Sequence, residues 1–510
     1  MLVKAISTGE GIPRLVELTV THAYTNKHGQ VVFFPQLSSM QRNSLWHRMF
    51  PASEVVGDRH PFWESNPSSV FTVSPSDAPL DPSLDMAVVA GAFCYYHDRE
   101  FPYMVCGEVT PDGTFLPLKK PVAIGLLAKK SGMPIIVPEP SAKFVASTGA
   151  QVLSVKDTME LVATIFEEED GARLVRADPT LLNLGAIDEW DDMMYVLGQE
   201  EAKTAIEIAV AGMHNVLFVG PPGEGKSELA KRTYTIAPPL SQEEALEVTS
   251  TWQQGNRIAD DTWMSRRPFV VATKQATPTA LMGGGDATSG PIPGLVALAN
   301  GGVLLADEIA EWPASRIEGL RTPLQDKQVV VSRRDWQVVY PASFLLAATC
   351  NPCPCGYHGH PTTPCRCTED KRRRYVNRLS GPIMDRIELK CWVPPLGEQI
   401  LDPPTGETSI TIRERVMQAV EMQRTRYRGV DGVSSNSELG PGLIERYCRE
   451  MPAALDEVRA TMGRTSLSAR GVHTLRKVAR TCADLEGSSM VQRSHIHKAE
   501  RFLRVPQLDV

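Results

Sequence analysis

A glycine-rich loop in the middle of the chain carries the clearest chemistry of the sequence. Residues 220–227 match the spacing G-x-x-x-x-G-K-S/T at every fixed position. Glycine lets backbone N–H groups converge on phosphate oxygens, the lysine reaches the β- and γ-phosphates, and the hydroxyl that follows binds Mg²⁺. The residues predicted to bind phosphates are Gly220, Pro221, Pro222, Gly223, Glu224, Gly225, Lys226 and Ser227.

Two adjacent acids further along supply the chemistry that such a loop needs. Asp307 and Glu308 directly follow the apolar run 303–306. Asp307 is predicted to hold Mg²⁺ together with Ser227, and Glu308 to act as the general base that polarises the attacking water. Paired acids after a strand are also typical of a solvated helix start, so this assignment depends on the loop upstream.

Three short apolar runs must position these side chains. They cover residues 216–219, 303–306 and 344–349, and their length is typical of buried strands. The third run leads to Asn351, whose amide can hydrogen-bond the attacking water or the γ-phosphate, although Asn-Pro is also a common turn. Strands that alternate with helical segments predict an α/β fold.

This ordered set of motifs is similar to that of AAA+ ATPases, which implies an AAA+ core with a helical lid. The resemblance places Asn351 at the sensor position. It places Arg386 where many such rings carry an arginine finger that enters the neighbouring subunit's site, with Arg378 as the alternative. Arg470 begins a segment with a helical period of apolar residues, which Ser468 can cap. A cation speeds phosphoryl transfer because negative charge spreads over the phosphate oxygens, but each arginine also fits a surface ion pair.

Cysteines gather in one segment. Two C-x-C pairs separated by nine residues can surround one structural Zn²⁺ ion, and they consist of Cys353, Cys355, Cys365 and Cys367. Four ligands leave no open position, so a catalytic metal is not expected. Reduced cysteines in a loop are the alternative, and His358 or His360 can replace one thiolate.

Two basic segments are predicted to contact DNA. The first follows the cysteines and consists of Lys371, Arg372, Arg373 and Arg374, which also fit a solvated helix end. The second is the tip of a hairpin predicted over residues 327–340. Its residues Arg333, Arg334 and Trp336 offer phosphate contacts and a stacking surface for single strands. Alternatively, the tryptophan packs on its own hairpin.

Longer stretches resemble the magnesium-chelatase-like ATPases of the ComM/YifB family. The resemblance is carried by residues 199–223, 239–248, 340–346, 351–357 and 467–485, and it is dense over roughly the last three hundred residues. It implies ATP and Mg²⁺ as cofactors and a homo-hexameric ring motor on single-stranded or branched DNA. Branch migration in recombination or natural transformation is the implied activity. A magnesium-chelatase-type motor that drives metal insertion into a tetrapyrrole is the alternative.

One motif departs from that family. The family usually has a paired histidine after an Arg-Pro-Phe segment, whereas residues 267–269 lead here to Lys274 and Gln275. Residues 1–60 also match the family poorly. Both features indicate a divergent branch.

The N-terminal part is similar to the Lon protease domain, a mixed α/β domain with a ribosomal S5 domain 2-like fold. The similarity rests on residues 82–87 and 107–138, and it places Ser83 at the nucleophile position. Lon also needs a lysine base, but the alignment puts Val122 there, with Lys119 and Lys120 out of register. Because a serine without its base is a poor nucleophile, the domain is predicted to be non-proteolytic. An ATP-dependent Lon-like serine protease is a further alternative.

Composition frames these assignments. The 510 residues carry a formal net charge of −7, which excludes a globally basic DNA-binding protein and leaves local patches. The sequence has no apolar stretch of membrane-spanning length and no signal-peptide pattern, so a cytoplasmic protein is expected. The predicted domains are a Lon-like domain (1–180), a linker (181–197), an AAA+ core with a zinc insert at 353–367 (198–395) and a helical lid (396–510).

Overall fold

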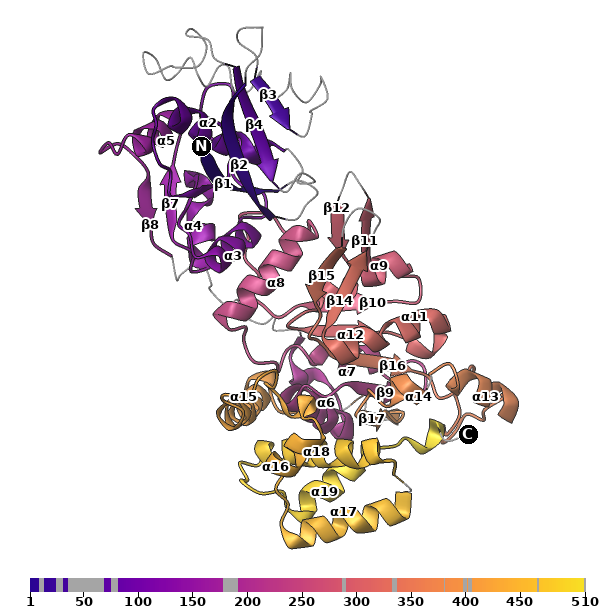
Figure 1. The fold of residues 1–510 in the computed structure, drawn as a ribbon. Helices are drawn as coiled ribbons and strands as arrows, with labels where there is room; N and C mark the ends of the chain where they lie inside the picture. Colours follow the sequence, from indigo (N-terminus) through magenta and orange to yellow (C-terminus); the bar gives the residue numbers. More distant parts are fainter. Residues whose placement is uncertain are drawn as a thin grey trace. The chain divides into compact units, whose positions relative to one another are not determined.

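Contacts divide the chain into two units, drawn as a ribbon in Figure 1. The first unit consists of Met1–Asn183, Ala245–Met264 and Gly285–Ile292, and the second of Leu184–Glu244, Ser265–Gly284 and Pro293–Val510. Each unit has a hydrophobic core of its own. The structure is a computed structural model that describes residues 1–8, 13–23, 31–34, 68–74, 81–177, 191–286, 290–332, 337–379, 381–397, 401, 406–465 and 467–508.

In the described residues of the first unit, a mixed sheet of eight strands forms the centre. The strands are β1 (Leu2–Ser7), β2 (Arg14–Ala23), β3 (Val31–Phe34), β4 (Ser68–Ser74), β5 (Met104–Val105), β6 (Ile135–Pro138), β7 (Val152–Val155) and β8 (Arg173–Val175). Their order is β3-β4-β2-β1-β5-β6-β7-β8. β1, β5, β6 and β7 are parallel, whereas β2 pairs antiparallel with β1 and β4.

Helices complete this mixed α/β unit. They include η3 (Pro82–Leu84), α2 (Asp85–Tyr96), α3 (Pro121–Ser131), α4 (Glu139–Ser147) and α5 (Thr158–Ile165). Lys120 and Gly132 flank helix α3 at its two ends. Proline in its first turn has the fixed φ that a helix start needs, and Gly132 ends it with a φ of 72°.

Part of the middle of the chain belongs to the first unit. Helix α8 (Gln242–Gln254) lies mostly within it. Further on, Trp263 stacks on Phe144 with ring centroids 5.2 Å apart, and the Asp260 carboxylate accepts a hydrogen bond from the Lys120 backbone N–H at 2.7 Å. These contacts attach to the first unit a segment that the sequence-based boundaries assign to residues 198–395.

A parallel sheet of five strands forms the centre of the second unit, among its described residues. The strands are β9 (Val216–Val219), β10 (Phe269–Ala272), β13 (Val303–Ala306), β16 (Leu345–Cys350) and β17 (Leu389–Trp392). Their order is β10-β13-β16-β9-β17. Every residue of β9, β13 and β16 is buried, as the apolar runs predict. All strands end on one side of the sheet, the carboxyl end, and begin on the other, the amino end.

Shorter elements surround this sheet. They are η6 (Met193–Tyr195), α6 (Glu200–Gly212), α7 (Lys226–Arg232), α9 (Pro278–Met282), α10 (Leu295–Leu298), η7 (Ile309–Glu311), α11 (Ala314–Gly319), α12 (Arg321–Asp326), α13 (Glu369–Val376) and α14 (Gly381–Met384). β11 (Gly283–Asp286) and β12 (Gly290–Pro293) form a separate two-stranded sheet. The linker predicted at 181–197 falls outside the described residues up to residue 190.

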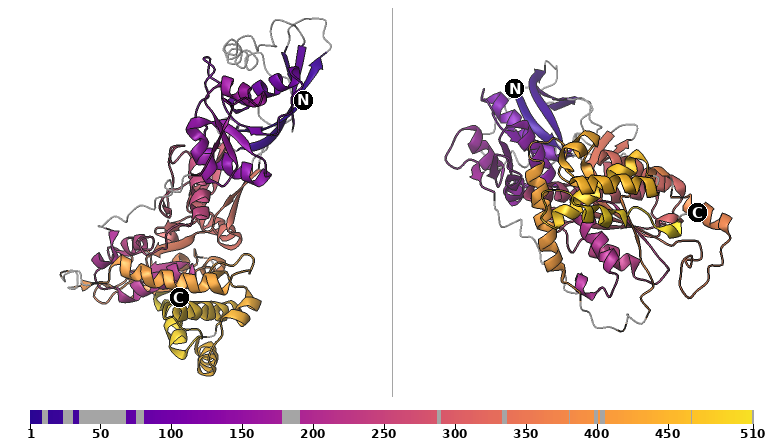
Figure 2. Two further views of the ribbon diagram at one scale, coloured as in Figure 1. Left: turned by 90° about the vertical axis from the view of Figure 1, so that its left-hand side faces the viewer. Right: turned by 90° about the horizontal axis from the view of Figure 1, so that it is seen from below.

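The C-terminal part of the second unit is helical. It contains α15 (Ser409–Arg426), η9 (Asn436–Glu438), α16 (Pro441–Tyr447), α17 (Pro452–Thr465), α18 (Ala469–Leu485), α19 (Arg493–Glu500) and η10 (Pro506–Leu508). Figure 2 shows these helices from two further directions. Ser468 caps α18, and the predicted stripe of Leu475, Val478 and Cys482 is fully buried. This stripe belongs to the same hydrophobic cluster as β9 and β17, so the lid shares one core with the sheet.

The predicted hairpin is confirmed. β14 (Gln328–Ser332) pairs antiparallel with β15 (Gln337–Pro341), in a register that sets Ser332 opposite Gln337. Val329 and Tyr340 face the core, whereas Val330 and Val339 are exposed. The tip residues Arg333, Arg334 and Trp336 lie outside the described residues.

Candidate functional site

The loop after β9 requires glycine for two reasons, backbone conformation and lack of space for a side chain. Gly223 and Gly225 have φ angles of 86° and 74°, and a Cβ at either position would meet nothing within 4 Å. Backbone conformation therefore demands glycine there. At Gly220 the constraint is space, because a Cβ would lie 2.4 Å from the carbonyl oxygen of Val393, which follows β17.

Lys226 lies folded back over this loop. Its Nζ donates to the carbonyl oxygens of Gly220 at 2.9 Å and Pro221 at 2.5 Å, and to Oδ1 of Asn351 at 3.1 Å. Burial lowers the pKa of Lys226, while the neighbouring Cys350 and Asp307 act in the opposite direction. Phosphate oxygens can replace these carbonyl partners and leave the ammonium fully hydrogen-bonded.

Asp307 connects the loop to the neighbouring strands. Its Oδ1 accepts hydrogen bonds from the hydroxyls of Ser227 and Thr349, each at 2.7 Å. Carboxylate and hydroxyl oxygens are ligands that Mg²⁺ accepts, so Asp307 and Ser227 fit the predicted metal role. No sequence motif marks Thr349, although its place near the end of β16 puts it at the carboxyl end of the sheet.

Glu308 has an unusual backbone and an unexpected partner. Its φ is 50°, and its N–H donates to Oγ1 of Thr349 at 2.9 Å. A non-glycine residue in this region is strained, which is common at functional sites. Its carboxylate accepts from Nζ of Lys274 at 3.1 Å, and the same Nζ binds Glu311 at 2.6 Å. Lys274, which the sequence marks as a departure from its relatives, therefore contacts the predicted base.

That ion pair is open to solvent. The side chains of Lys274 and Glu308 are 42% and 46% exposed. Hydrogen bonds with Glu311 and Glu308 raise the pKa of Lys274, so it stays charged at neutral pH. Water screens a contact this exposed, so it can open at little cost.

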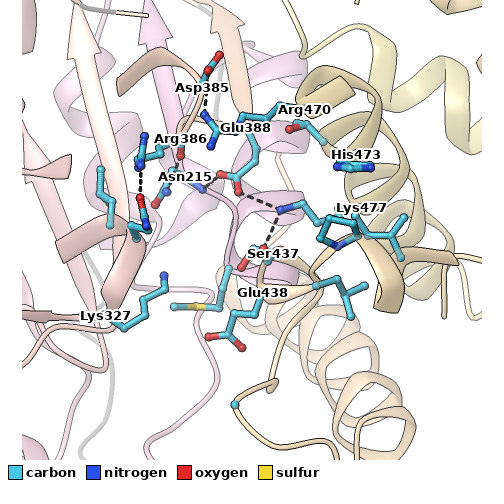
Figure 3. Close-up of a pocket in the computed structure, with 18 residues that line it drawn as sticks. Asn215, Lys327, Asp385, Arg386, Glu388, Ser437, Glu438, Arg470, His473 and Lys477 are labelled. Carbon is cyan, nitrogen blue, oxygen red and sulfur yellow. Dashed lines mark hydrogen bonds and ion pairs between the residues drawn. The ribbon is translucent and has the colours of Figure 1, made fainter. Parts of the chain in front are cut away.

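Arg386 and Arg470 lie in a second place, a cavity of about 650 Å³ that Figure 3 shows. Arg386 donates to Oε1 of Gln325 and, at 2.7 Å, to the carbonyl of Pro382. Arg470 pairs with Asp385 at 2.9 Å. Burial lowers the pKa of Arg386, and the positive charge of Arg470 acts in the same direction. The alternative finger, Arg378, donates to the Ala310 carbonyl at 3.5 Å instead.

This cavity lies at the amino end of the sheet. The side-chain amide of Asn215 donates to the carbonyl oxygen of Arg386 at 2.8 Å, and Asn215 directly precedes β9. The phosphate loop begins at Gly220, directly after β9. At about 3.3 Å per residue, the four residues of β9 separate the two places by about 13 Å. The structure thus brings together Lys226 and the acids but holds both arginines apart from them.

The four cysteines gather as a metal site requires. The Sγ atom of Cys353 lies 3.4 Å from that of Cys355 and 3.7 Å from that of Cys365. The Sγ atom of Cys367 completes a group in which all ligand atoms lie within 4.8 Å of one another. Tetrahedral zinc with bonds of about 2.3 Å places its sulfurs about 3.8 Å apart, so this donor set fits.

Neighbouring groups support that assignment. Burial acts to raise the pKa of Cys355, but hydrogen bonds from the backbone of Tyr357 and Arg366 outweigh it and lower the pKa to about 6. His360 is engaged elsewhere, because its Nδ1 accepts from the backbone of Thr363 at 3.0 Å. Among the described residues, the cysteine group contains neither His358 nor His360.

The basic segment forms helix α13. Thr368 caps it by accepting from the backbone N–H of Lys371 at 3.4 Å. Arg373 pairs with Glu369 at 2.9 Å. Of the residues predicted to contact DNA in this helix, Lys371, Arg373 and Arg374 are exposed. Arg372 is half-buried.

In the first unit, Ser83 forms hydrogen bonds with backbone groups through its hydroxyl. Its side chain is buried, donates to the carbonyl of Ile6 at 3.2 Å and accepts from the N–H of Thr8 at 3.0 Å. Val122, at the position of the missing base, is fully buried in α3. A hydroxyl held in this way is poorly placed to attack a peptide.

Comparisons with known proteins extend over most of the chain. The family described as magnesium chelatase, subunit ChlI, matches residues 192–401, and the ChlI C-terminal family matches residues 406–502. An uncharacterized protein of Mycobacterium tuberculosis is 36% identical over 392 residues, which are 75% of this chain and 75% of that protein.

Two further relatives carry names. The uncharacterized protein YifB of Escherichia coli is 32% identical over 446 residues, 86% of this chain and 85% of its own. Competence protein ComM of Haemophilus influenzae is 36% identical over 311 residues, which are 60% of this chain and 59% of that protein. Within the described part of the chain, no helix combines the length and apolar character needed to cross a membrane. The chain belongs to the magnesium chelatase ChlI-like family of AAA+ ATPases.

Proposed function

We propose that this protein is an ATP-driven ring motor that acts on DNA. The observation that carries the proposal is the separation of Lys226 from Arg386 and Arg470 by the length of β9. In one chain the arginines lie at the wrong end of the sheet for their own phosphate loop. A neighbouring subunit can present them, which requires a closed head-to-tail ring. The proposed number of six subunits per ring comes from the family resemblance.

Each residue at the carboxyl end has a proposed step. Lys226 leaves its carbonyl partners and binds the β- and γ-phosphates. Ser227 and Asp307 hold Mg²⁺, which when bound neutralises charge on the phosphate oxygens. Asn351 orients the γ-phosphate or the water, and Glu308 leaves Lys274 to take the proton of the attacking water.

DNA is the proposed partner because helix α13 carries exposed cations that can bind phosphates. Helix α13 presents Lys371, Arg373 and Arg374 to solvent, and the strands of the hairpin lead to Arg333 and Arg334. Such contacts bind phosphates without regard to sequence. The name of the relative ComM, a competence protein, agrees with DNA handling. Branch migration is the specific activity proposed.

The first unit is proposed to assist assembly or DNA handling without proteolysis. The hydrogen bonds of Ser83 to Ile6 and Thr8 support this view. Unfolded casein is expected to survive incubation with the protein and ATP, and the Ser83→Ala protein to behave like the parent. Cleavage that depends on Ser83 would restore the protease alternative.

A chelatase motor is the second candidate, favoured by the description of the matching family. Rates of ATP hydrolysis with no DNA, single strands, duplex and a four-way junction separate the two. A DNA motor is expected to be stimulated several-fold, most by the junction, and to lose this stimulation when Arg333 and Arg334 are both alanine. Stimulation by a tetrapyrrole-binding partner and none by any DNA would favour the chelatase.

A further inference from the structure

The cysteine group lies directly against the proposed nucleotide site. β16 ends at Cys350, and the next residue, Asn351, binds the ammonium of Lys226 at 3.1 Å. Cys353, which is fully buried, follows two residues later. A short stretch of chain therefore joins a candidate metal ligand to the partner of the phosphate-binding lysine.

A second contact joins the cysteine turn to the loop itself. Gly356 is buried, accepts a φ of 85°, and closes a turn by donating its N–H to the Cys353 carbonyl at 2.9 Å. A Cβ on Gly356 would lie 2.6 Å from Cδ of Pro222 in the phosphate loop. The turn that carries two thiolates thus packs on the loop without space for a methyl group.

We propose that metal binding at the four cysteines and nucleotide binding at the phosphate loop are thermodynamically coupled through the turn 353–356. A bound metal holds the four sulfurs together and so fixes Gly356 against Pro222 and Asn351 against Lys226. Without metal, the loop and the lysine lose this support, and nucleotide affinity falls. Because coupling between binding free energies is reciprocal, bound nucleotide must also raise the affinity of the four cysteines for metal by the same factor. This inference rests on the proposed nucleotide and zinc sites.

The test measures the zinc affinity of the full-length protein at equilibrium. With excess Mg²⁺ present, a zinc-selective chromophoric chelator competes for the zinc, in the absence and presence of a saturating non-hydrolysable ATP analogue. The analogue is expected to raise the zinc affinity by about fivefold or more, the lower end of typical couplings. The Lys226→Ala protein is expected to retain zinc and to lose the effect of the analogue.

Gly356 and Gly359, which both lie between Cys355 and Cys365, give a matched pair of variants. Gly359 has a φ of 79°, and a Cβ there would lie 2.7 Å from the flexible side chain of Gln507, away from the phosphate loop. Gly356→Ala is expected to keep one zinc per chain but to weaken binding of a fluorescent ATP analogue about fivefold or more. Gly359→Ala carries the same backbone strain and is expected to bind the analogue like the parent.

Pro222→Ala removes the contact without adding a clash, and it serves if Gly356→Ala does not fold. It is expected to hold zinc and to show a smaller effect of nucleotide on zinc affinity. Equal zinc affinities with and without bound nucleotide, in a protein that binds both, would overturn the coupling alone. Absence of zinc or of nucleotide binding would contradict the proposed sites and the coupling with them.

Discussion

The two ends of the parallel sheet in the second unit differ in the groups that their charged side chains bind. At the carboxyl end, Ser227 and Thr349 both donate to Asp307, and Lys226 donates to carbonyl oxygens of the phosphate loop. At the amino end, Arg386 and Arg470 border an open cavity. The first arrangement is a site that needs only its substrate. The second has cations whose partners, Gln325 and Asp385, belong to no part of the phosphate loop.

This difference teaches how such a fold divides the work of hydrolysis. Parallel strands place all their C-terminal loops on one side, so one chain can assemble a phosphate loop, a metal-binding acid and a base together. The same geometry keeps groups at the amino end of β9 about 13 Å from the loop that follows this strand. Under the proposed function, a second subunit therefore completes the site with arginine.

Loss of Lys226 is expected to have the largest effect. Lys226→Ala removes the ammonium that binds Gly220, Pro221 and Asn351. Nucleotide binding, measured with a fluorescent ATP analogue, is expected to disappear, and hydrolysis to fall to the assay background. Lys231→Ala on the same helix removes an exposed ion pair with Glu228 and is the control. Retained tight binding in Lys226→Ala would remove the carboxyl end from the proposed site.

Arg386→Ala is expected to lower hydrolysis by about 10³-fold or more while nucleotide still binds, as for other arginine fingers. An equal mixture with Lys226→Ala is the sharper experiment. Roughly a quarter of the interfaces in a mixed ring then combine an intact loop with an intact arginine, so activity partly returns. No recovery in rings shown to be mixed would contradict action across the interface. Arg459→Ala, which breaks an exposed ion pair in the lid, is the control.

Glu308→Gln is expected to lower hydrolysis by about 10²- to 10⁴-fold, the usual contribution of a general base, with nucleotide binding preserved. Glu311→Gln is the matched control, because Glu311 binds the same Lys274 without following β13 directly. Single-turnover rates compare the two proteins. A normal rate in Glu308→Gln, or an equal loss in both, would move the base elsewhere.

Lys274→Ala is expected to have the smallest effect. It frees Glu308 from an ion pair that solvent already screens, so hydrolysis is expected to rise by about two- to fivefold. Nucleotide affinity should stay unchanged, since Lys274 contacts neither the loop nor Asp307 in the described residues. A fall below the parent rate would mean that Lys274 positions the carboxylate productively.

Local spacing made much of the carboxyl end predictable. The phosphate loop, the acid pair and Asn351 each follow an apolar run, and buried strands of that length admit few other arrangements. The two C-x-C pairs also depend on short-range geometry, so the grouping of four thiolates follows from spacing of a few residues. The apolar period of α18 predicts its buried side for the same reason.

Contacts between residues that are far apart in the sequence could not be predicted from local spacing. Thr349 of β16 donates to Asp307, which follows the neighbouring strand β13. Lys274, which lies after β10, pairs with Glu308. Nothing local to residues 245–264 indicates that they pack in the first unit, where Trp263 meets Phe144.

The sequence by itself determined the chemical groups at the site and the strands that carry them, because both depend on neighbours along the chain. Only the tertiary structure decided that the arginines stand at the opposite end of the sheet and that Gly356 rests on Pro222. Strand order and the closing of long loops bring such residues together, and these depend on packing of the whole core, which no short pattern encodes.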